Sequence, residues 1–306
     1  MRSWAEFKVA IRKRETPYHA FLYDVAKTLF GISVPVVPGL HAFLYNEWAT
    51  RTSAWHNFWR VVYYEPMFKS QCAHVGKGFR MWYAGNGTTR ILGKIAIHID
   101  DDVSIFDNVS FVGLTVCDNP ELHIGEGSYI APRVRFMVAR CVRVGCYSLV
   151  GCHMIFDNSG HPVTDARARM MRGGGHPSVK GVKPVTIGDL CFLGEGSYVY
   201  PGTTVGDGVV AKVGTHIMGD IPPFCLIEGN PCRIVGKLPI SDNLVEVFGP
   251  ERVAAWKTAQ ALAEVDTPPP AAGYVQPPMA LAGDRFAVVS GLAGTGADNP
   301  GRGGAQ

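Results

Sequence analysis

Residues 185–237 read VTIGDLCFLGEGSYVYPGTTVGDGVVAKVGTHIMGDIPPFCLIEGNPCRIVGK, and an aliphatic residue stands at every sixth position from Ile187 to Ile217. An α-helix repeats near 3.6 residues and a β-strand near 2, so neither element alone explains a period of six. A coil with three short faces does explain it, because three hexads complete one turn and each aliphatic residue points to the axis.

The same period recurs upstream, between residues 99 and 156. Its members are Ile99, Ile105, Phe111, Ile124, Ile130, Phe136, Val144, Val150 and Phe156. Small or β-branched residues often stand four places later, where the coil would turn its corners: Val103, Val109, Ser128, Val134, Ser148, Ser197, Thr203, Val209 and Thr215. One turn cannot bury its own interior, so the sequence predicts an all-β core, a stacked parallel β-helix of about five or six turns.

Three short motifs carry a resemblance to a known family. They are Asp220-Ile-Pro-Pro223, Gly229-Asn-Pro-Cys-Arg233 and, upstream, Ser159-Gly-His-Pro-Val163. With the repeat, they make residues 95–238 similar to the hexapeptide-repeat acyltransferases, and among these to the galactoside, maltose and polysaccharide O-acetyltransferases. The resemblance implies a left-handed β-helix, acetyl-CoA as co-substrate, no metal, and a homotrimer whose sites form between adjacent subunits.

The predicted catalytic residue, His161, lies where the repeat is interrupted. Hexads stop after Phe156 and restart at Ile187, and loop 157–184 between them is polar and glycine-rich. The resemblance makes His161 the general base that deprotonates the acceptor hydroxyl, a task suited to a neutral imidazole. A covalent route through Cys152 or Cys191 is disfavoured, because buried cysteines are inert.

The resemblance places acetyl-CoA along the C-terminal coils. Its pantetheine arm would contact Phe192, Gly194, Glu195, Val213, Gly214, Met218 and Gly219, and its phosphates Arg233 and Lys237. Backbone N–H groups near Gly194 would stabilise the oxyanion. The chain departs from the family pattern at Glu195, where a small residue is common, and at Gly219, where a lysine is common. Because a carboxylate near an anionic cofactor is unfavourable, Glu195 is expected to face the acceptor or solvent.

The acceptor side is predicted to include Ala131, Arg133 and Asn158. Related sugar enzymes often carry an asparagine one coil before the histidine, and this chain has Ala131 there. Several arginines favour an anionic acceptor, although they fit ordinary solvated surface positions equally well: Arg133, Arg135, Arg167, Arg169 and Arg172. The predicted reaction is acetyl transfer to a sugar hydroxyl, of a surface polysaccharide or its precursor.

Residues 1–90 form a segment of different character, with twelve lysines and arginines against five acids and five of the six tryptophans. We expect it to be helical, over residues 19–31 and 40–64, with breaks at Pro35 and Pro38. Its aromatic and basic residues fit peripheral membrane contact through residues 1–64. They fit packing on the β-helix or on a neighbouring subunit equally well.

The β-helix is expected over residues 91–238, and three further expectations concern the rest of the chain. A C-terminal helix is predicted over residues 239–266, capped by Ser241 or Asp242. The Pro/Gly-rich tail, residues 267–306, is predicted to be disordered. No stretch has the length and apolar character of a membrane span, and residues 1–15 lack the pattern of a secretion signal.

Composition narrows the remaining possibilities. Of 306 residues, 47% are hydrophobic and 18% charged, which excludes a wholly disordered or collagen-like chain. The eight cysteines include no Cys-x-x-Cys pair, which favours reduced packing cysteines over disulfides or zinc. We therefore expect an enzyme of the cytoplasm, which is either free in solution or bound peripherally to the inner membrane face. We expect no nucleic-acid partner.

Two other functions fit the same scaffold. A metal-dependent carbonic anhydrase needs three converging histidines, and the candidates are His98, His123, His153, His161 and His176. The spacing of His153 and His161 is wider than that group requires, although stoichiometric zinc in the purified protein would favour it. A non-catalytic scaffold is the other alternative, and the intact Gly-His-Pro motif argues against it.

Overall fold

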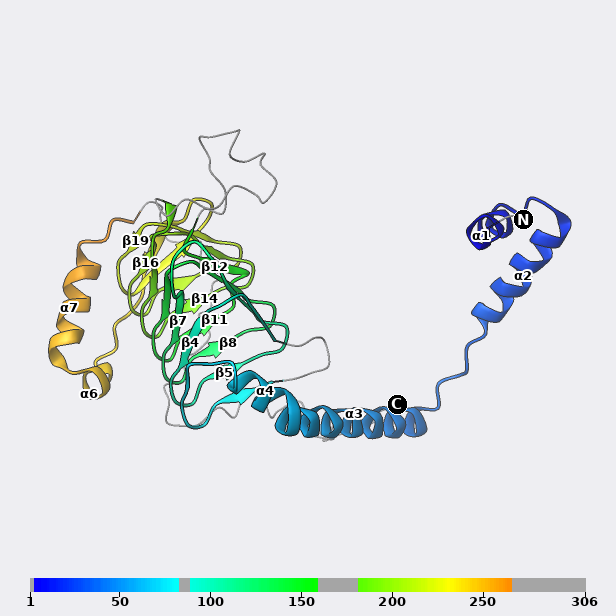
Figure 1. Ribbon diagram of the computed structural model, residues 1–306, viewed down its shortest axis with the longest axis horizontal. Coiled ribbons are helices and arrows are strands. Elements are labelled where there is room, and N and C mark those ends of the chain that lie inside the picture. The colour runs from blue at the N-terminus through cyan, green and yellow to red at the C-terminus, as the bar shows by residue number, and fades with distance from the viewer. Residues whose placement is uncertain (1–2, 83–88, 159–180, 266–306) are drawn as a thin grey trace, which may run out of the picture.

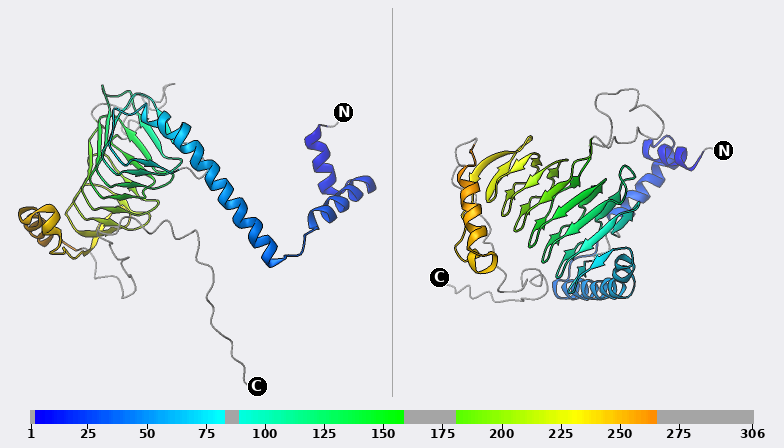
Figure 2. Two further views of the ribbon diagram at one scale, coloured as in Figure 1. Left: turned by 90° about the horizontal axis from the view of Figure 1, so that it is seen from below. Right: turned by 60° about the vertical axis from the view of Figure 1, so that its left-hand side comes forward.

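The computed structural model describes residues 3–82, 89–158 and 181–265. Its main body is a parallel β-helix whose short strands form three flat sheets around one axis (Figures 1 and 2). Strands of successive turns pair in parallel, and the last pair, β20 with β21, is antiparallel. The predicted fold, a left-handed parallel β-helix flanked by helices, is confirmed.

Each turn contributes one strand to each sheet. The seven-stranded sheet contains β1 (His74–Val75), β4 (Ala96–Ile99), β7 (Glu121–Ile124), β10 (Cys141–Val144), β13 (Val185–Ile187), β16 (Thr204–Val205) and β19 (Asp220–Ile221). The eight-stranded sheet contains β2 (Arg80–Met81), β5 (Ser104–Ile105), β8 (Tyr129–Ile130), β11 (Leu149–Val150), β14 (Phe192–Leu193), β17 (Val210–Ala211), β20 (Cys225–Glu228) and β21 (Arg233–Lys237). The six-stranded sheet contains β3 (Arg90–Leu92), β6 (Ser110–Gly113), β9 (Arg135–Val138), β12 (Met154–Phe156), β15 (Tyr198–Val199) and β18 (His216–Ile217). We name the corners by the sheets that they join: the 7/8, 8/6 and 6/7 edges.

The residues selected by the six-residue spacing fill the interior. All are buried except Phe156, and the nine small or β-branched corner residues are buried as well. In place of Phe156, its neighbour Ile155 points into the interior, where it pairs with Phe136 of the preceding turn. Val150 pairs with Ile130, and Ile155 pairs with Phe136. The segment from Val150 to Ile155 is one residue shorter than the segment from Ile130 to Phe136 in the preceding turn. The inner position therefore arrives one residue earlier than the spacing predicts.

The β-helix begins earlier than the sequence indicates. Its first turn contains β1 and β2, in which Val75 pairs with Ile99 and Met81 with Ile105. These residues keep the six-residue spacing, but residues 82–90 interrupt it before the next hexad. The expected start at residue 91 is thus too late, and the seven-stranded sheet has more turns than the predicted five or six.

The N-terminal segment is helical, as predicted. It consists of α1 (Trp4–Lys13), α2 (Pro17–Gly31), α3 (Pro38–Trp59), the π-helical turn η1 (Arg60–Tyr64) and α4 (Glu65–Lys69). Helix α3 extends away from the β-helix (Figure 1) and has no buried residue. Helix α4 covers the end of the core, where Phe68 lies 5.7 Å from both Phe79 and Phe111, between ring centroids. Within the residues that the structure describes, no helix combines the length and apolar character needed to cross a membrane.

The C-terminal helix is two helices, α6 (Leu244–Phe248) and α7 (Pro250–Ala261). The prediction of a single helix over residues 239–266, capped by Ser241 or Asp242, is therefore wrong. Gly249 has φ of 82°, and Pro250 has no N–H to continue the α6 hydrogen bonds, so the chain turns between them. The expected tail, residues 267–306, lies outside the described residues.

Helix α7 is attached to the 7/8 edge by charged hydrogen bonds. Arg252 Nη2 donates to Asp189 at 2.7 Å and to Asp207 at 2.9 Å. Trp256 Nε1 donates to the same Asp207 carboxylate at 2.8 Å. The other oxygen of Asp207 accepts the Asp189 backbone N–H at 2.7 Å, so one carboxylate joins two turns and the helix.

Replacing Asp207 with asparagine is expected to lower the free energy of unfolding by about 1–3 kcal/mol, because a single uncharged amide oxygen replaces the two carboxylate oxygens that accept from the Asp189 N–H, Arg252 and the buried Trp256. Urea denaturation measures the change. Asp242→Asn is the control, because Asp242 pairs with Lys257 at 2.9 Å on the exposed surface, where no measurable loss is expected. Equal losses in the two variants would contradict the attachment of α7 through Asp207.

Candidate functional site

The root of the predicted catalytic loop is held rigidly on the 6/7 edge. The buried Asp157 carboxylate accepts the backbone N–H groups of Ala139 at 2.6 Å, Arg140 at 2.6 Å and Cys141 at 2.9 Å. Burial raises the pKa of Asp157, and these three hydrogen bonds oppose that rise. Across the loop base, Asn158 forms an antiparallel bridge with Val182. Residues 159–180, with His161 and His176, lie outside the described residues, but both ends of the loop are fixed.

Several predicted site residues lie along the 8/6 edge. Arg133 Nη2 donates to Glu195 Oε1 at 2.9 Å, and both side chains are mostly exposed. These two residues lie two turns apart. The turn between them contains the segment from Val150 to Ile155, which is one residue shorter than its counterpart in the preceding turn. The carboxylate expected to repel an anionic cofactor therefore has an arginine partner. Ala131, in the same corner as Arg133, is half-buried against the core.

Two positions on this edge, Gly194 and Gly214, are occupied by glycine for different reasons. A Cβ at Gly194 would lie 2.7 Å from the Val213 backbone nitrogen, so the close stacking of two turns requires glycine there. Gly214 has φ of 74°, and a Cβ added to it would meet no atom within 4 Å, beside the exposed Val213. The Gly194 N–H donates to the Ala211 carbonyl at 2.9 Å. This N–H is therefore engaged within the β-helix, and the expectation that backbone N–H groups near Gly194 stabilise an oxyanion stays a prediction for its neighbours.

The two predicted phosphate ligands have different surroundings. Arg233 lies 3.6 Å from Glu228, which also accepts from Lys212 at 2.6 Å. These cations, Lys212 first, lower the pKa of Glu228. Lys237 Nζ donates to the Ala261 carbonyl at the end of α7, 3.0 Å away. Arg233 is thus near the 8/6 edge, whereas Lys237 is bound to the C-terminal helix.

The structure does not bring all the predicted residues together. Met218 and Gly219 follow β18 on the 6/7 edge, the edge that also holds Asn158. Phe192 points outward from the eight-stranded sheet and is 37% exposed. Within one chain, the candidate cofactor and loop residues therefore occupy two edges, which the six-stranded sheet separates.

The outer side of that sheet carries three rings that the sequence did not single out, those of Tyr198, Tyr200 and His216. Tyr198 lies between His153 and His216, with centroid distances of 5.3 and 5.0 Å, and its ring is tilted against that of His153 and stacked on that of His216. The Tyr200 hydroxyl is hydrogen-bonded to His216 Nδ1 at 2.9 Å, and Phe156 packs on the Tyr200 ring. In the sequence, Tyr198 and His216 directly precede the inward-pointing aliphatic residues Val199 and Ile217, so they are expected to point outward. The six-residue spacing identifies only the inward residues and does not indicate which outward residues will contact one another.

Two alternatives meet physical obstacles in the described residues. Cys152 and Cys191 are buried, and desolvation raises the pKa of both thiols, that of Cys191 to about 12. Protonated thiols are poor nucleophiles, which disfavours a covalent route. Of the histidines considered for carbonic anhydrase, His98 and His123 lie on the seven-stranded sheet, whereas His153 packs against Tyr198 of the six-stranded sheet. These three do not converge within one chain.

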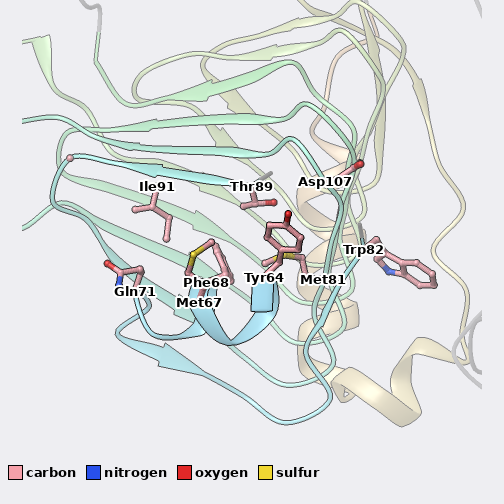
Figure 3. A pocket seen from close by; sticks show the side chains of 10 residues that line it. Tyr64, Met67, Phe68, Gln71, Met81, Trp82, Thr89, Ile91 and Asp107 are labelled. Carbon is pink, nitrogen blue, oxygen red and sulfur yellow. The ribbon is translucent and has the colours of Figure 1, made fainter. Parts of the chain in front are cut away.

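A separate hollow of about 360 Å³ lies at the N-terminal end of the β-helix (Figure 3). Helix α4 and the first turns line it, largely with apolar side chains such as Phe68, Met81 and Ile91. Trp82 and the buried Asp107 also border it. The predicted cofactor residues are not part of its lining.

No protein-family model matches the chain. Among curated proteins, a Saccharomyces cerevisiae protein that bears the name acetyltransferase is 28% identical over 128 residues, 42% of this chain and 62% of its own length. Galactoside O-acetyltransferase of Escherichia coli is 28% identical over 122 residues, 40% of this chain and 57% of that protein. The chain therefore spans less than two thirds of the length of these curated relatives.

Solved structures that match include AntD, an N-acyltransferase from Bacillus cereus in complex with dTDP and 3-hydroxybutyryl-CoA. Its TM-score is 0.47 at 16% identity, over 63% of this chain and 96% of AntD. The polysialic acid O-acetyltransferase OatWY has a TM-score of 0.40 at 17% identity, over 60% of this chain and 99% of OatWY. The curated relatives carry acetyltransferase names, and the resemblance of this chain to the hexapeptide-repeat acyltransferases is thereby confirmed.

Proposed function

We propose that the protein is an acetyl-CoA-dependent O-acetyltransferase that acts on a sugar hydroxyl of a surface polysaccharide or its precursor. The observation that carries the proposal is the place of the Gly-His-Pro motif. His161 follows closely after Asp157, whose carboxylate binds three backbone N–H groups of the preceding turn. The fixed backbone at Asp157, four residues before His161 in the sequence, supports a role for this loop in holding a reacting hydroxyl in position.

The proposed reaction is a direct transfer in a ternary complex. The His161 imidazole accepts the proton of the acceptor hydroxyl while that oxygen attacks the thioester carbonyl carbon. The tetrahedral intermediate then collapses, the carbon–sulfur bond breaks, and the imidazolium returns its proton to the CoA sulfur. The products are an acetyl ester of the sugar and free CoA, and no enzyme thiol takes part.

We place the acetyl-CoA along the 8/6 edge, near Val213, Gly214 and Glu195, with its phosphates toward Arg233. A homotrimer is part of the proposal, because the candidate residues lie on two edges of one β-helix. If the 8/6 edge of one copy faces the 6/7 edge of another, an extended cofactor contacts both sets at once. Sedimentation equilibrium is then expected to give three chains per particle.

An acceptor screen tests the proposed function. Free sugars, nucleotide sugars and lipid-linked oligosaccharides are each incubated with the protein and acetyl-CoA, and released CoA is measured with a thiol reagent. We expect release above the acceptor-free rate with at least one class of glycan. No acceptor-dependent release with any class would contradict the proposal.

The Arg133–Glu195 pair gives a prediction about the cofactor. Arg133→Ala is expected to raise the KM for acetyl-CoA about three- to tenfold, because Glu195 then faces the anionic cofactor without its partner. The double variant Arg133→Ala/Glu195→Ala should restore much of the affinity, because the repelling carboxylate is gone. Initial rates at varied acetyl-CoA measure both. A double variant no better than Arg133→Ala would contradict placing the cofactor beside Glu195.

We further propose that residues 1–64 bind the inner face of a membrane peripherally, which would keep the protein in the cytoplasm near lipid-linked glycans. Trp48 and Trp55 on α3 are more than half exposed, and the segment is basic. In flotation with anionic liposomes, Trp48→Ser/Trp55→Ser should bind at least about tenfold more weakly than the unchanged protein. Equal binding by the two proteins, or none by either, would contradict the proposal.

A further inference from the structure

The outer face of the seven-stranded sheet carries a cluster of metal-ligating side chains, which lies beside the 6/7 edge because the Cys141 N–H donates to Asp157. In β7, burial alternates so that Glu121 and His123 point outward on the same side. The neighbouring strand β10 pairs in register, with Cys141 opposite Glu121 and Arg143 opposite His123. A carboxylate, an imidazole and a thiol thus meet on two adjacent turns.

The distances in this cluster suit one transition-metal ion. One ligand atom each from Glu121, His123 and Cys141 lies within 4.8 Å of the other two, and His123 Nε2 is 3.2 Å from Glu121 Oε2. Ligand atoms around tetrahedral zinc lie about 3.3–3.8 Å apart, given bond lengths near 2.0–2.3 Å. Side-chain rotations can therefore close the cluster around an ion without moving the strands. All three residues are half-buried, which limits competition from water.

Two neighbours bear on the chemistry of the cluster. His98, on the preceding turn, stacks on His123 with ring centroids 4.6 Å apart and planes 7° apart, which fixes the orientation of the His123 ring. Arg143 lies beside Cys141 and favours its thiolate, although burial raises the pKa of that thiol overall. An incoming divalent ion would displace the thiol proton and take the place of Arg143 as partner of the sulfur.

We propose that Glu121, His123 and Cys141 bind one Zn²⁺ ion per chain, with water in the fourth position. The mixed nitrogen, sulfur and oxygen donors match zinc, which is borderline in softness. The ion would join β7 to β10 at the place where the Cys141 N–H also holds Asp157 at the loop root. The site is independent of acetyl transfer, and the absence of Cys-x-x-Cys in the sequence does not bear on it, because its ligands come from separate turns.

Metal binding by the purified full chain tests this site. After chelator treatment, the protein is equilibrated with Zn²⁺ and the bound metal is measured by mass spectrometry. Cobalt substitution provides a second readout, because a thiolate ligand gives Co²⁺ a charge-transfer absorption band. We expect one ion per chain, and a loss of affinity of at least about 100-fold in Cys141→Ser and in His123→Gln. The matched control is Cys146→Ser, a half-buried cysteine outside the cluster, which should bind as the unchanged protein does.

The outcomes separate this site from others in the chain. Loss of zinc in both ligand variants, with the control unaffected, supports it. If Cys141→Ser does not fold, as judged by circular dichroism, Glu121→Gln at a more exposed position provides the same comparison. Failure of the unchanged protein to bind zinc would overturn the proposal. Equal binding by all variants would overturn it too, because the ion would then be held elsewhere.

Discussion

Replacing His161 with asparagine is expected to lower kcat for acetyl transfer by about 10²–10⁴-fold, because the reacting hydroxyl loses its proton acceptor. The KM for acetyl-CoA should change little, since His161 is proposed to act on the acceptor hydroxyl and not to bind the cofactor. Steady-state rates with the best acceptor measure both constants.

The matched control is His176→Asn, in the same loop. It removes the imidazole of the second Gly-His-Pro tripeptide in the loop, residues 175–177, which lacks the flanking serine and valine of Ser159-Gly-His-Pro-Val163, and we expect nearly full activity. The comparison also tests the non-catalytic scaffold alternative, in which neither substitution matters. Equal activity of His161→Asn and the unchanged protein would show that His161 is not the base.

The second large effect is on the free energy of unfolding, and it should differ between two adjacent residues of one strand. Leu193 in β14 is fully buried, whereas Phe192 beside it points outward. Leu193→Ala is expected to lower the free energy of unfolding by about 2–5 kcal/mol, since it removes core methyl groups and leaves a cavity. Phe192→Ala should cost about 1 kcal/mol or less, because its ring is partly solvated.

Kinetics should reverse the order of the two variants. Phe192→Ala is expected to raise the KM for acetyl-CoA about three- to tenfold, because Phe192 is a proposed cofactor contact. Leu193→Ala should leave that KM near its normal value at temperatures where the variant is folded. Urea denaturation and initial rates give the two measurements. A larger stability loss in Phe192→Ala would contradict the inward and outward assignment.

The hexad spacing predicted most of the β-helix because it reflects a purely local geometry. Each turn must place one apolar residue inward per face, so Ile187 or Leu193 can be identified without knowing its neighbours in space. The same logic failed where the spacing itself changed. Before Ile155 the corner is one residue shorter than in the preceding turn. In the first turn, residues 82–90 separate the hexad of Val75 and Met81 from the next inward residue.

The candidate site was harder to predict, because its contacts join different turns. The Arg133–Glu195 pair forms across a shortened turn, and no local pattern signals which corner side chains will meet. The Asp157 carboxylate is similar, since its three N–H partners lie in the turn before it. The Glu121, His123 and Cys141 cluster depends on strand register, which single-residue motifs do not record.

The central claim is that the chain makes an acetyl ester of a sugar, with His161 as the base. The most direct measurement incubates isotopically labelled acetyl-CoA with the best acceptor and analyses the purified sugar before and after mild alkali. The account predicts alkali-labile acetyl label on the sugar with the unchanged protein, and almost none in the same time with His161→Asn. Label in an alkali-stable amide, or equal ester formation by the variant, would contradict it.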